Sequence, residues 1–175
     1  MGLPALSLIL GGAASGKSSY GEALVRATPG SRVYIATAQG FDAEMQTKIA
    51  AHRAARAGDG WRTIEAPLDL AGALAGVGAT EIVLLDCATL WLSNVMLAGR
   101  DWQEEATALI AALAACPAPV VVISNETGQG IVPDNQLARR FRAAQGGLNQ
   151  QLAAEAQFVA MVMAGLPLVL KGAAP

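Results

Sequence analysis

A glycine-rich loop near the amino terminus constrains this chain more than any other feature. Residues 11–18 fit the pattern G-x-x-x-x-G-K-[ST], in which backbone N–H groups and the start of the following helix surround a phosphate. Residues 6–10 before this phosphate loop are mostly apolar, as in a buried strand, and residues 18–27 after it suit a helix. This order predicts that the loop binds a nucleoside triphosphate. The loop residues are Gly11, Gly12, Ala13, Ala14, Ser15, Gly16, Lys17 and Ser18.

Charged and hydroxyl groups around this loop predict a magnesium site. Lys17 is placed to reach the β- and γ-phosphates, and the Ser18 hydroxyl is placed to ligate Mg²⁺. Asp86 ends the apolar run of residues 81–86, where an acid commonly holds Mg²⁺ directly or through water. Glu65 ends the alternating run of residues 61–65 and is either solvated, a metal ligand or a contact for a nucleotide hydroxyl.

The remaining pattern predicts an α/β fold, with a mostly parallel sheet flanked by helices. We expect one domain over residues 1–175. The predicted helix of residues 134–156 has Asp134 as its cap, with Leu137 and Phe141 facing the core. Further strands are expected at 31–37, 61–65, 81–86 and 119–124, further helices at 42–57, 68–76, 89–97 and 102–115, and a closing antiparallel pair at 158–163 and 166–171.

Composition and charge argue against several classes of protein. The net charge of -2 disfavours a nucleic-acid partner. The uncharged stretch 106–124 is interrupted by Pro117 and Pro119, so it reads as a helix, a turn and a strand rather than a membrane span. Cys87 and Cys116 lack metal-ligand spacing and are expected to be buried free thiols, which fits the cytoplasm. The amino terminus lacks the basic segment of a signal peptide.

Two groups of basic residues can each be assigned more than one function. His52, the single histidine, shares a predicted helix face with Met45 and Ile49, which favours packing. The neighbouring cations Lys48, Arg53, Arg56 and Arg62 form either a solvated face or a polyphosphate site beside the imidazole. Residues 125–133 form a polar loop after a strand, which predicts a substrate loop. Arg139, Arg140 and Arg142 follow it and either bind phosphate or form a solvated or subunit-contacting face.

Taken in order, these motifs resemble one family over nearly the whole chain. The chain is similar to bifunctional adenosylcobinamide kinases and adenosylcobinamide-phosphate guanylyltransferases of cobalamin biosynthesis. The resemblance implies a P-loop, RecA-like fold and a homotrimer. It also implies phosphoryl transfer from ATP or GTP to adenosylcobinamide, followed by transfer of GMP from GTP to the phosphate so formed. The motifs are residues 11–18, 34–37, 49–53, 61–63, 84–87 and 124–133.

The same resemblance implies roles for individual residues. His52 matches the histidine that carries GMP as a covalent intermediate, and Lys17 supports the chemistry. The guanine nucleotide contacts would include Ala36, Thr37, Ala38, Arg53, Ala54, Ala55, Arg56, Glu65 and Asp86. Two positions depart from the family's common pattern, which has Arg at the position of Ala14 and often Glu at the position of Asp86.

Two other functions remain compatible with the phosphate loop alone. One is a simple P-loop kinase for another small alcohol or a nucleotide, in which His52 only packs. The other is a RecA-like interaction or motor module that uses nucleotide hydrolysis to change shape. The first predicts activity that survives loss of His52, and the second predicts turnover stimulated by a macromolecular partner.

Overall fold

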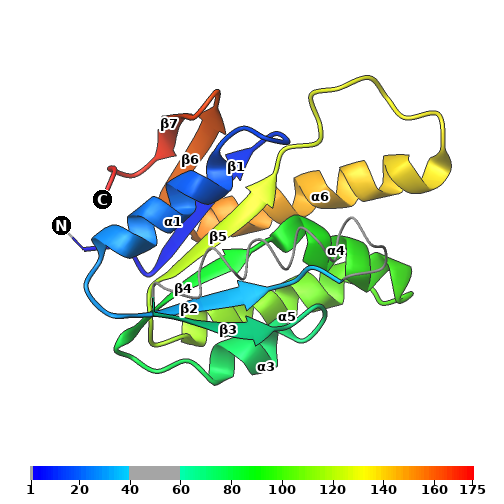
Figure 1. Cartoon of the computed structure of the whole chain (residues 1–175). Helices are drawn as coiled ribbons and strands as arrows, with labels where there is room; N and C mark the ends of the chain where they lie inside the picture. The colour runs from blue at the N-terminus through cyan, green and yellow to red at the C-terminus, as the bar shows by residue number, and fades with distance from the viewer. Residues whose placement is uncertain (1, 40–59) are drawn as a thin grey trace.

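The computed structural model describes residues 2–39 and 60–175, whose strands form one seven-stranded sheet (Figure 1). The strand order is β3-β2-β4-β5-β1-β6-β7, with all neighbours parallel except the antiparallel pair β6 and β7. The strands are β1 (Leu6–Gly11), β2 (Ser31–Ala36), β3 (Trp61–Glu65), β4 (Glu81–Asp86), β5 (Val120–Asn125), β6 (Phe158–Met163) and β7 (Leu166–Lys171). This arrangement confirms the predicted RecA-like, mostly parallel α/β fold with a C-terminal antiparallel pair.

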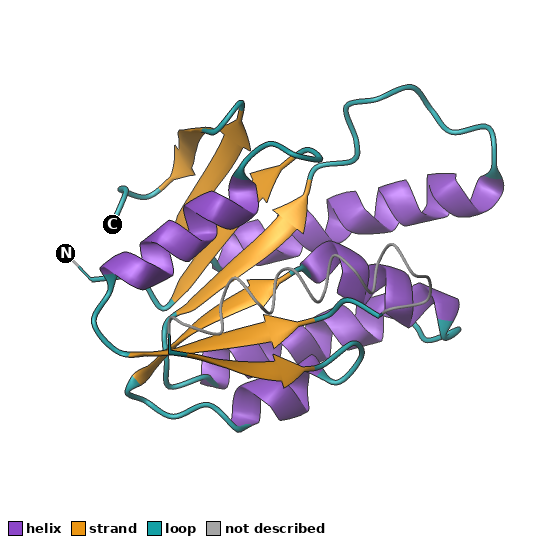
Figure 2. Cartoon of the chain, in the orientation of Figure 1, coloured by secondary structure: helices purple, strands orange, loops and turns teal. Residues whose placement is uncertain are grey.

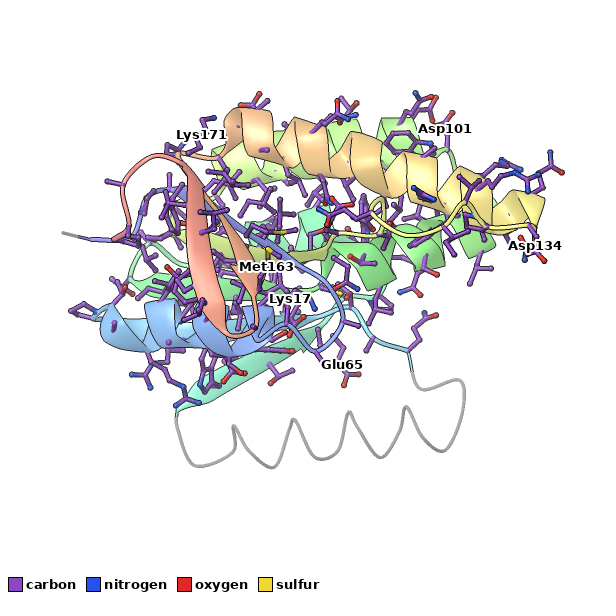
Figure 3. All side chains as sticks on the ribbon, turned by 90° about the horizontal axis from the view of Figure 1, so that it is seen from above. Lys17, Glu65, Asp101, Asp134, Met163 and Lys171 are labelled. Atoms are coloured by element: carbon purple, nitrogen blue, oxygen red, sulfur yellow. The ribbon has the colours of Figure 1, made fainter. Side chains whose placement is uncertain are left out.

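Helices cover both faces of the sheet unequally. Figures 1 and 2 show α1 on one face and the other described helices on the opposite face, and Figure 3 shows the layers from above. Covering both faces explains why the central strands β1, β4 and β5 are almost continuously apolar. The described helices are α1 (Lys17–Ala27), α3 (Leu70–Ala75), α4 (Ala88–Leu97), α5 (Trp102–Ala115) and α6 (Gln136–Glu155). The helix expected over 42–57 lies outside the described residues.

The phosphate-loop helix α1 lies unusually close to the sheet. A Cβ added at Gly21 would lie 2.5 Å from Cδ1 of Ile123 on β5, so glycine is what permits this approach. Val25 of α1 is fully buried in the same cluster as Ile9, Ile123 and Leu84. This packing fixes the start of α1, and with it the phosphate loop, over the carboxyl ends of β1, β5 and β4.

Three local expectations were wrong. The cap of α6 is Asn135, whose Oδ1 accepts from the N–H of Ala138 at 2.8 Å, because the helix begins one residue later than expected. Leu137 is 54% exposed rather than facing the core, since the first turns of α6 extend beyond the sheet (Figure 1). Cys87 is buried as expected, whereas Cys116 at the end of α5 is only partly buried. In the described part of the chain, no helix combines the length and apolarity needed to span a membrane.

Candidate nucleotide site

The phosphate loop has the backbone geometry of an anion cradle. Gly16 adopts a left-handed conformation with φ of 93° and begins α1, while Tyr20 donates its N–H to the carbonyl of Gly16 at 2.9 Å. Lys17 folds over the loop, with Nζ donating to the carbonyl of Gly12 at 3.1 Å. The loop therefore places an ammonium group and the positive end of a helix dipole around one concave backbone turn.

The tip of the β6–β7 hairpin supports the phosphate loop from outside. Gly165 at this tip donates its N–H to the carbonyl of Ser15 at 2.8 Å. A Cβ added at Gly16 would lie 3.1 Å from Cα of Gly165, and one added at Gly11 would lie 2.8 Å from the carbonyl oxygen of Val162. Contact with β6 thus requires glycine at position 11, whereas the left-handed backbone at Gly16 favours glycine there.

Asp86 lies on the same face of the sheet as α1. Ile82 and Leu84, which alternate with it along β4, belong to the cluster that includes Val25 of α1. Because only β5 separates β4 from β1, Asp86 ends a strand about 10 Å from the strand that carries the phosphate loop. The hydroxyl of Tyr34 on β2 donates to Oδ2 of Asp86 at 3.0 Å, which orients the carboxylate. Asp86 thus ends a strand on the face of the sheet that carries α1, and its role as a metal-side acid stays a prediction.

Thr37 holds the turn after Asp86 in place. Its hydroxyl accepts from the N–H of Cys87 and donates to the carbonyl of the same residue, both at 2.8 Å. Its own N–H donates to the carbonyl of Asp86, and its carbonyl accepts from Asn94 at 2.8 Å. Thr37 is fully buried and its polar groups are all engaged internally. These hydrogen bonds hold the backbone on both sides of the Asp86–Cys87 bond in place.

The Cys87 thiol lies in this same supported turn. Burial, reinforced by the neighbouring charge of Asp86, raises the pKa of Cys87 to about 11, while the ammonium of Lys17 acts in the opposite direction. A thiol with this pKa is protonated at neutral pH and has no role as a nucleophile there.

A buried polar network lies beneath the carboxyl end of β5. Ser124 donates to Oδ1 of Asn149 at 2.6 Å and accepts from Nε2 of Gln145 at 2.9 Å. Asn149 donates to the carbonyl of Asn125 at 3.0 Å, and Asn125 donates its N–H to Oγ1 of Thr89 at 2.7 Å. Four of these side chains, from α4, β5 and α6, are buried. The network fixes the backbone where β5 passes between the phosphate loop and Asp86.

Two arginines of α6 hold the expected substrate loop, which follows β5 and arches beyond the sheet (Figure 1). Arg139 donates to the carbonyls of Pro133 at 2.9 Å and Asp134 at 2.6 Å, and Arg142 donates to the carbonyl of Gly128. A groove of about 340 Å³ runs between the loop and α6, lined by Gly128, Val132, Arg139, Arg142, Ala143, Gly146, Gly147 and Gln150. These arginines therefore stabilise the loop, a role the sequence had not suggested.

Other predicted site residues are placed differently. Ala36 ends β2 in register with Asp86, which puts it beside the acid, and Ala38 follows two residues later in the chain. Glu65 ends edge strand β3, four strands and thus about 19 Å from β1, so the structure does not bring it to the phosphate loop.

Arg62 pairs with Glu81 at 2.8 Å instead of facing a polyphosphate. The Gly78 N–H and Arg62 lower the pKa of Glu81. His52, Arg53, Ala54, Ala55 and Arg56 lie outside the described residues.

Sequence reasoning missed the residues that support the site from other strands. The sequence places Tyr34 in a strand and in the motif of residues 34–37, and Gly165 between the two closing strands. Alternation along β2 and β4 could have placed Tyr34 and Asp86 on one face, but not at hydrogen-bond distance. No local pattern could have paired Gly165 with Ser15, because 149 residues lie between them along the chain.

Fold and site together define a P-loop nucleotide-binding protein. Residues 7–170 match the family model described as cobinamide kinase / cobinamide phosphate guanyltransferase. The chain is 44% identical over 168 residues to the bifunctional adenosylcobalamin biosynthesis protein CobP of Pseudomonas aeruginosa, covering 94% of this chain and 96% of that protein. It is 41% identical over 180 residues to CobU of Escherichia coli, covering 94% and 98%. The chain belongs to this cobinamide kinase and guanyltransferase family.

A solved structure supports the fold independently of sequence. The structure of the protein PH0250 from Pyrococcus horikoshii superposes with a TM-score of 0.55 at 8% identity. The match covers 99% of this chain and 89% of that chain. At this identity the likeness extends to the fold alone.

Proposed function

We propose that this protein phosphorylates the aminopropanol hydroxyl of adenosylcobinamide with ATP or GTP and then converts the product to adenosylcobinamide-GDP. The observation that carries the proposal is the phosphate loop facing Asp86 across β5, in a chain that belongs to the cobinamide kinase and guanyltransferase family. In the kinase reaction the hydroxyl oxygen bonds to the γ-phosphorus, its proton is released, and the nucleoside diphosphate leaves. Lys17 and the N-terminus of α1 stabilise the charge on the phosphates.

The second reaction uses His52 as a nucleophile. An imidazole nitrogen attacks the α-phosphorus of GTP, pyrophosphate leaves, and GMP is held on His52 as a phosphoramidate. An oxygen of the corrinoid phosphate then attacks the same phosphorus, which releases His52 and forms the diphosphate bond. Arg53 and Arg56, which come one and four residues after His52, supply cations for the phosphates, and Ala54 and Ala55 complete this part of the guanine nucleotide site.

Mg²⁺ fits the residues at this site. The donors are the hydroxyl of Ser18 at the start of α1 and the carboxylate of Asp86, which Tyr34 orients. Within residues 2–39 and 60–175, no cluster of three His, Cys, Asp or Glu side chains could hold a metal without further ligands. Such a sparse donor set suits Mg²⁺, which retains waters and binds phosphate oxygens. Bound there, the ion would neutralise phosphate charge.

We further propose that residues 1–175 act as one catalytic domain within a cytoplasmic homotrimer. The hairpin patch, defined as the exposed side chains Met163, Leu166, Leu168, Val169 and Leu170, supports association. Every residue of edge strand β7 is exposed, and an apolar edge strand of this kind favours burial against another chain. The two free cysteines suit a reducing compartment.

The two reactions can be tested separately with labelled nucleotides. Purified protein is incubated with GTP labelled at the α-phosphate, denatured, and examined for covalent label that acid releases and base does not. A second assay follows transfer from ATP labelled at the γ-phosphate to adenosylcobinamide. We expect Lys17→Ala to abolish both signals, whereas His52→Ala should abolish covalent labelling and preserve phosphoryl transfer.

The outcomes separate the competing functions. Phosphoryl transfer with no covalent label in a folded, GTP-binding protein would leave a kinase without guanylyl transfer. Nucleotide hydrolysis that ignores corrinoid and responds to a macromolecular partner would instead support a nucleotide-switch module. Discharge of the label by corrinoid phosphate would establish the complete second reaction.

A further inference from the structure

Asn125 is the last residue of β5, the strand between the phosphate loop and the acid. It pairs in register with Gly11, the first residue of the phosphate loop. The following residue, Glu126, donates its N–H to the carbonyl of Gly11 at 3.1 Å. Asp86 pairs with Ile123, so Asn125 extends two residues, or about 7 Å, beyond the level of Asp86. Asn125 thus lies between the two halves of the proposed nucleotide site, the phosphate loop and Asp86.

The side chain of Asn125 leaves the sheet on the face that carries α1. Val121 and Ile123, which alternate with it along β5, pack in the cluster that contains Val25 of α1. Ser124 points to the opposite face, where it joins Gln145 and Asn149. The carboxamide of Asn125 therefore shares a face of the sheet with Lys17 and Asp86.

Two side chains from other elements hold the backbone of Asn125 in place. Thr89 accepts its N–H, Asn149 donates to its carbonyl, and both partners are buried. Oδ1 of Asn125 is itself buried and has no hydrogen-bond partner among the described residues. A buried acceptor without a hydrogen-bond partner costs folding free energy. Such an acceptor on a rigid backbone is typical of a group that binds a ligand.

We propose that the carboxamide of Asn125 contacts the reacting groups of the kinase step. Its Nδ2 donates to an oxygen of the γ-phosphate, and its Oδ1 accepts from the attacking hydroxyl, which directs the oxygen at phosphorus. The amide takes up no proton; the hydroxyl proton is released to water as the new O–P bond forms and the bond to the β-phosphate oxygen breaks. The assignment rests on the proposed kinase activity.

The proposal makes Asn125 specific for one of the two reactions. The γ-phosphate is the transferred group in the kinase step, but it departs within pyrophosphate when His52 attacks the α-phosphorus. Removing the Asn125 contacts should therefore affect phosphoryl transfer far more than formation of the histidyl-GMP. It should also weaken binding of ATP more than binding of ADP, which lacks the γ-phosphate.

Asn125→Asp tests this with nearly unchanged shape, because it replaces the donor with an anion facing the phosphate. We expect kinase kcat to fall at least about 100-fold, as for loss of a preorganised donor, and ATP affinity to fall about 10-fold. ADP affinity, and the initial rate of covalent labelling at saturating α-labelled GTP, should stay within about threefold of the parent, since neither depends on this donor. Asn135→Asp is the matched control, because an aspartate also caps α6 and should leave all four values unchanged.

Each result bears on the proposal directly. Equal losses of ATP and ADP affinity, or a kinase kcat close to that of the parent, would overturn it. If Asn125→Asp does not fold, Asn125→Ser provides the same ATP-to-ADP comparison without the added charge. Because that comparison needs no corrinoid, it decides the role of Asn125 even where the parent transfers no phosphoryl group to adenosylcobinamide, a result that would count against the proposed function instead.

Discussion

At the scale of single residues, the site depends on side chains that hold other residues of the site in place. Thr37 and Tyr34 act on Asp86 from a neighbouring strand, one through the backbone of Cys87 and the other through the carboxylate itself. A sequence pattern identifies the acid at the end of β4 because strand and acid are contiguous. It does not identify the supporting pair, because their contacts depend on β2 lying beside β4.

The Cys87 thiol gives the protein a specific alkaline sensitivity. In the folded protein the pKa of Cys87 is raised to about 11, whereas the pKa of a thiol in the unfolded chain is about 8.5. Between these values the unfolded chain loses the proton and the folded chain keeps it, so the free energy of unfolding falls as pH rises. From pH 7.5 to 9.5, we expect Cys87→Ala to lose about 1 kcal/mol less stability than the parent, measured by denaturant unfolding under reducing conditions.

The other cysteine provides the control for this measurement. Cys116 is only partly buried at the end of α5, so Cys116→Ala should keep the pH dependence of the parent. Identical pH dependence in the parent and in Cys87→Ala would show that the thiol does not contribute.

At the scale of elements, nearly every described helix and strand could be predicted from the sequence. Apolar runs, caps and prolines mark β1, β4, β5, α5 and the β6–β7 pair, because those signals are local. The contacts between elements could not be predicted in the same way. The loop after β5 was expected to bind substrate, but the bonds from Arg139 and Arg142 that hold it depend on the return path of α6.

The β6–β7 hairpin should influence nucleotide binding through its tip. Gly165 has φ of 79°, so Gly165→Ala strains the turn that donates to Ser15 and should weaken ATP binding about fivefold, equivalent to about 1 kcal/mol. Gly99 is the matched control, because it has φ of 70° and equal space but lies between α4 and α5. Both variants should lose about 1 kcal/mol of stability, whereas equal ATP affinities in calorimetry would contradict a role for the tip.

The arginine contacts should keep the loop after β5 closed against α6. Thermolysin cleaves before exposed aliphatic residues, and Ile131 and Val132 are 97% and 66% exposed. Arg139→Ala and Arg142→Ala each remove bonds to loop carbonyls, so cleavage before Ile131 should accelerate about tenfold. The measurement is the rate of native-state cleavage, followed by mass spectrometry.

Arg140 separates this effect from a general loss of positive charge. It is exposed between the two bonded arginines on α6, so Arg140→Ala should leave the cleavage rate unchanged. Acceleration by all three substitutions to the same degree would mean that charge, rather than the loop contacts, controls cleavage.

At the scale of the whole molecule, the hairpin patch is the surface most suited to bury another copy. Cross-strand pairing places Leu166 opposite Met163 and Leu168 opposite Met161, which makes one continuous apolar face. Leu168→Lys should therefore convert the proposed trimer to monomers in sedimentation experiments, because a buried lysine would lack a partner. Leu97→Lys, at a site 67% exposed on α4, should leave the assembly intact.

The sequence could not predict this surface, although it predicted both strands. The alternation in β6 and β7 resembles that of an ordinary edge pair, and only the position of α6 shows that Leu166 and Leu168 remain uncovered. A trimer in which Leu168→Lys remains fully assembled would assign the interface to another face.

The contact between Gly165 and Ser15 joins the proposed assembly surface to the phosphate loop through a single turn. If association orders the hairpin, subunit association and nucleotide binding become linked equilibria, and each must strengthen the other by the same free energy. The apparent affinity for ATP would then rise with protein concentration, and saturating nucleotide would protect the oligomer against dilution. Through the hairpin, the fraction of protein that holds nucleotide, and with it the activity per molecule, would increase with the concentration of the protein.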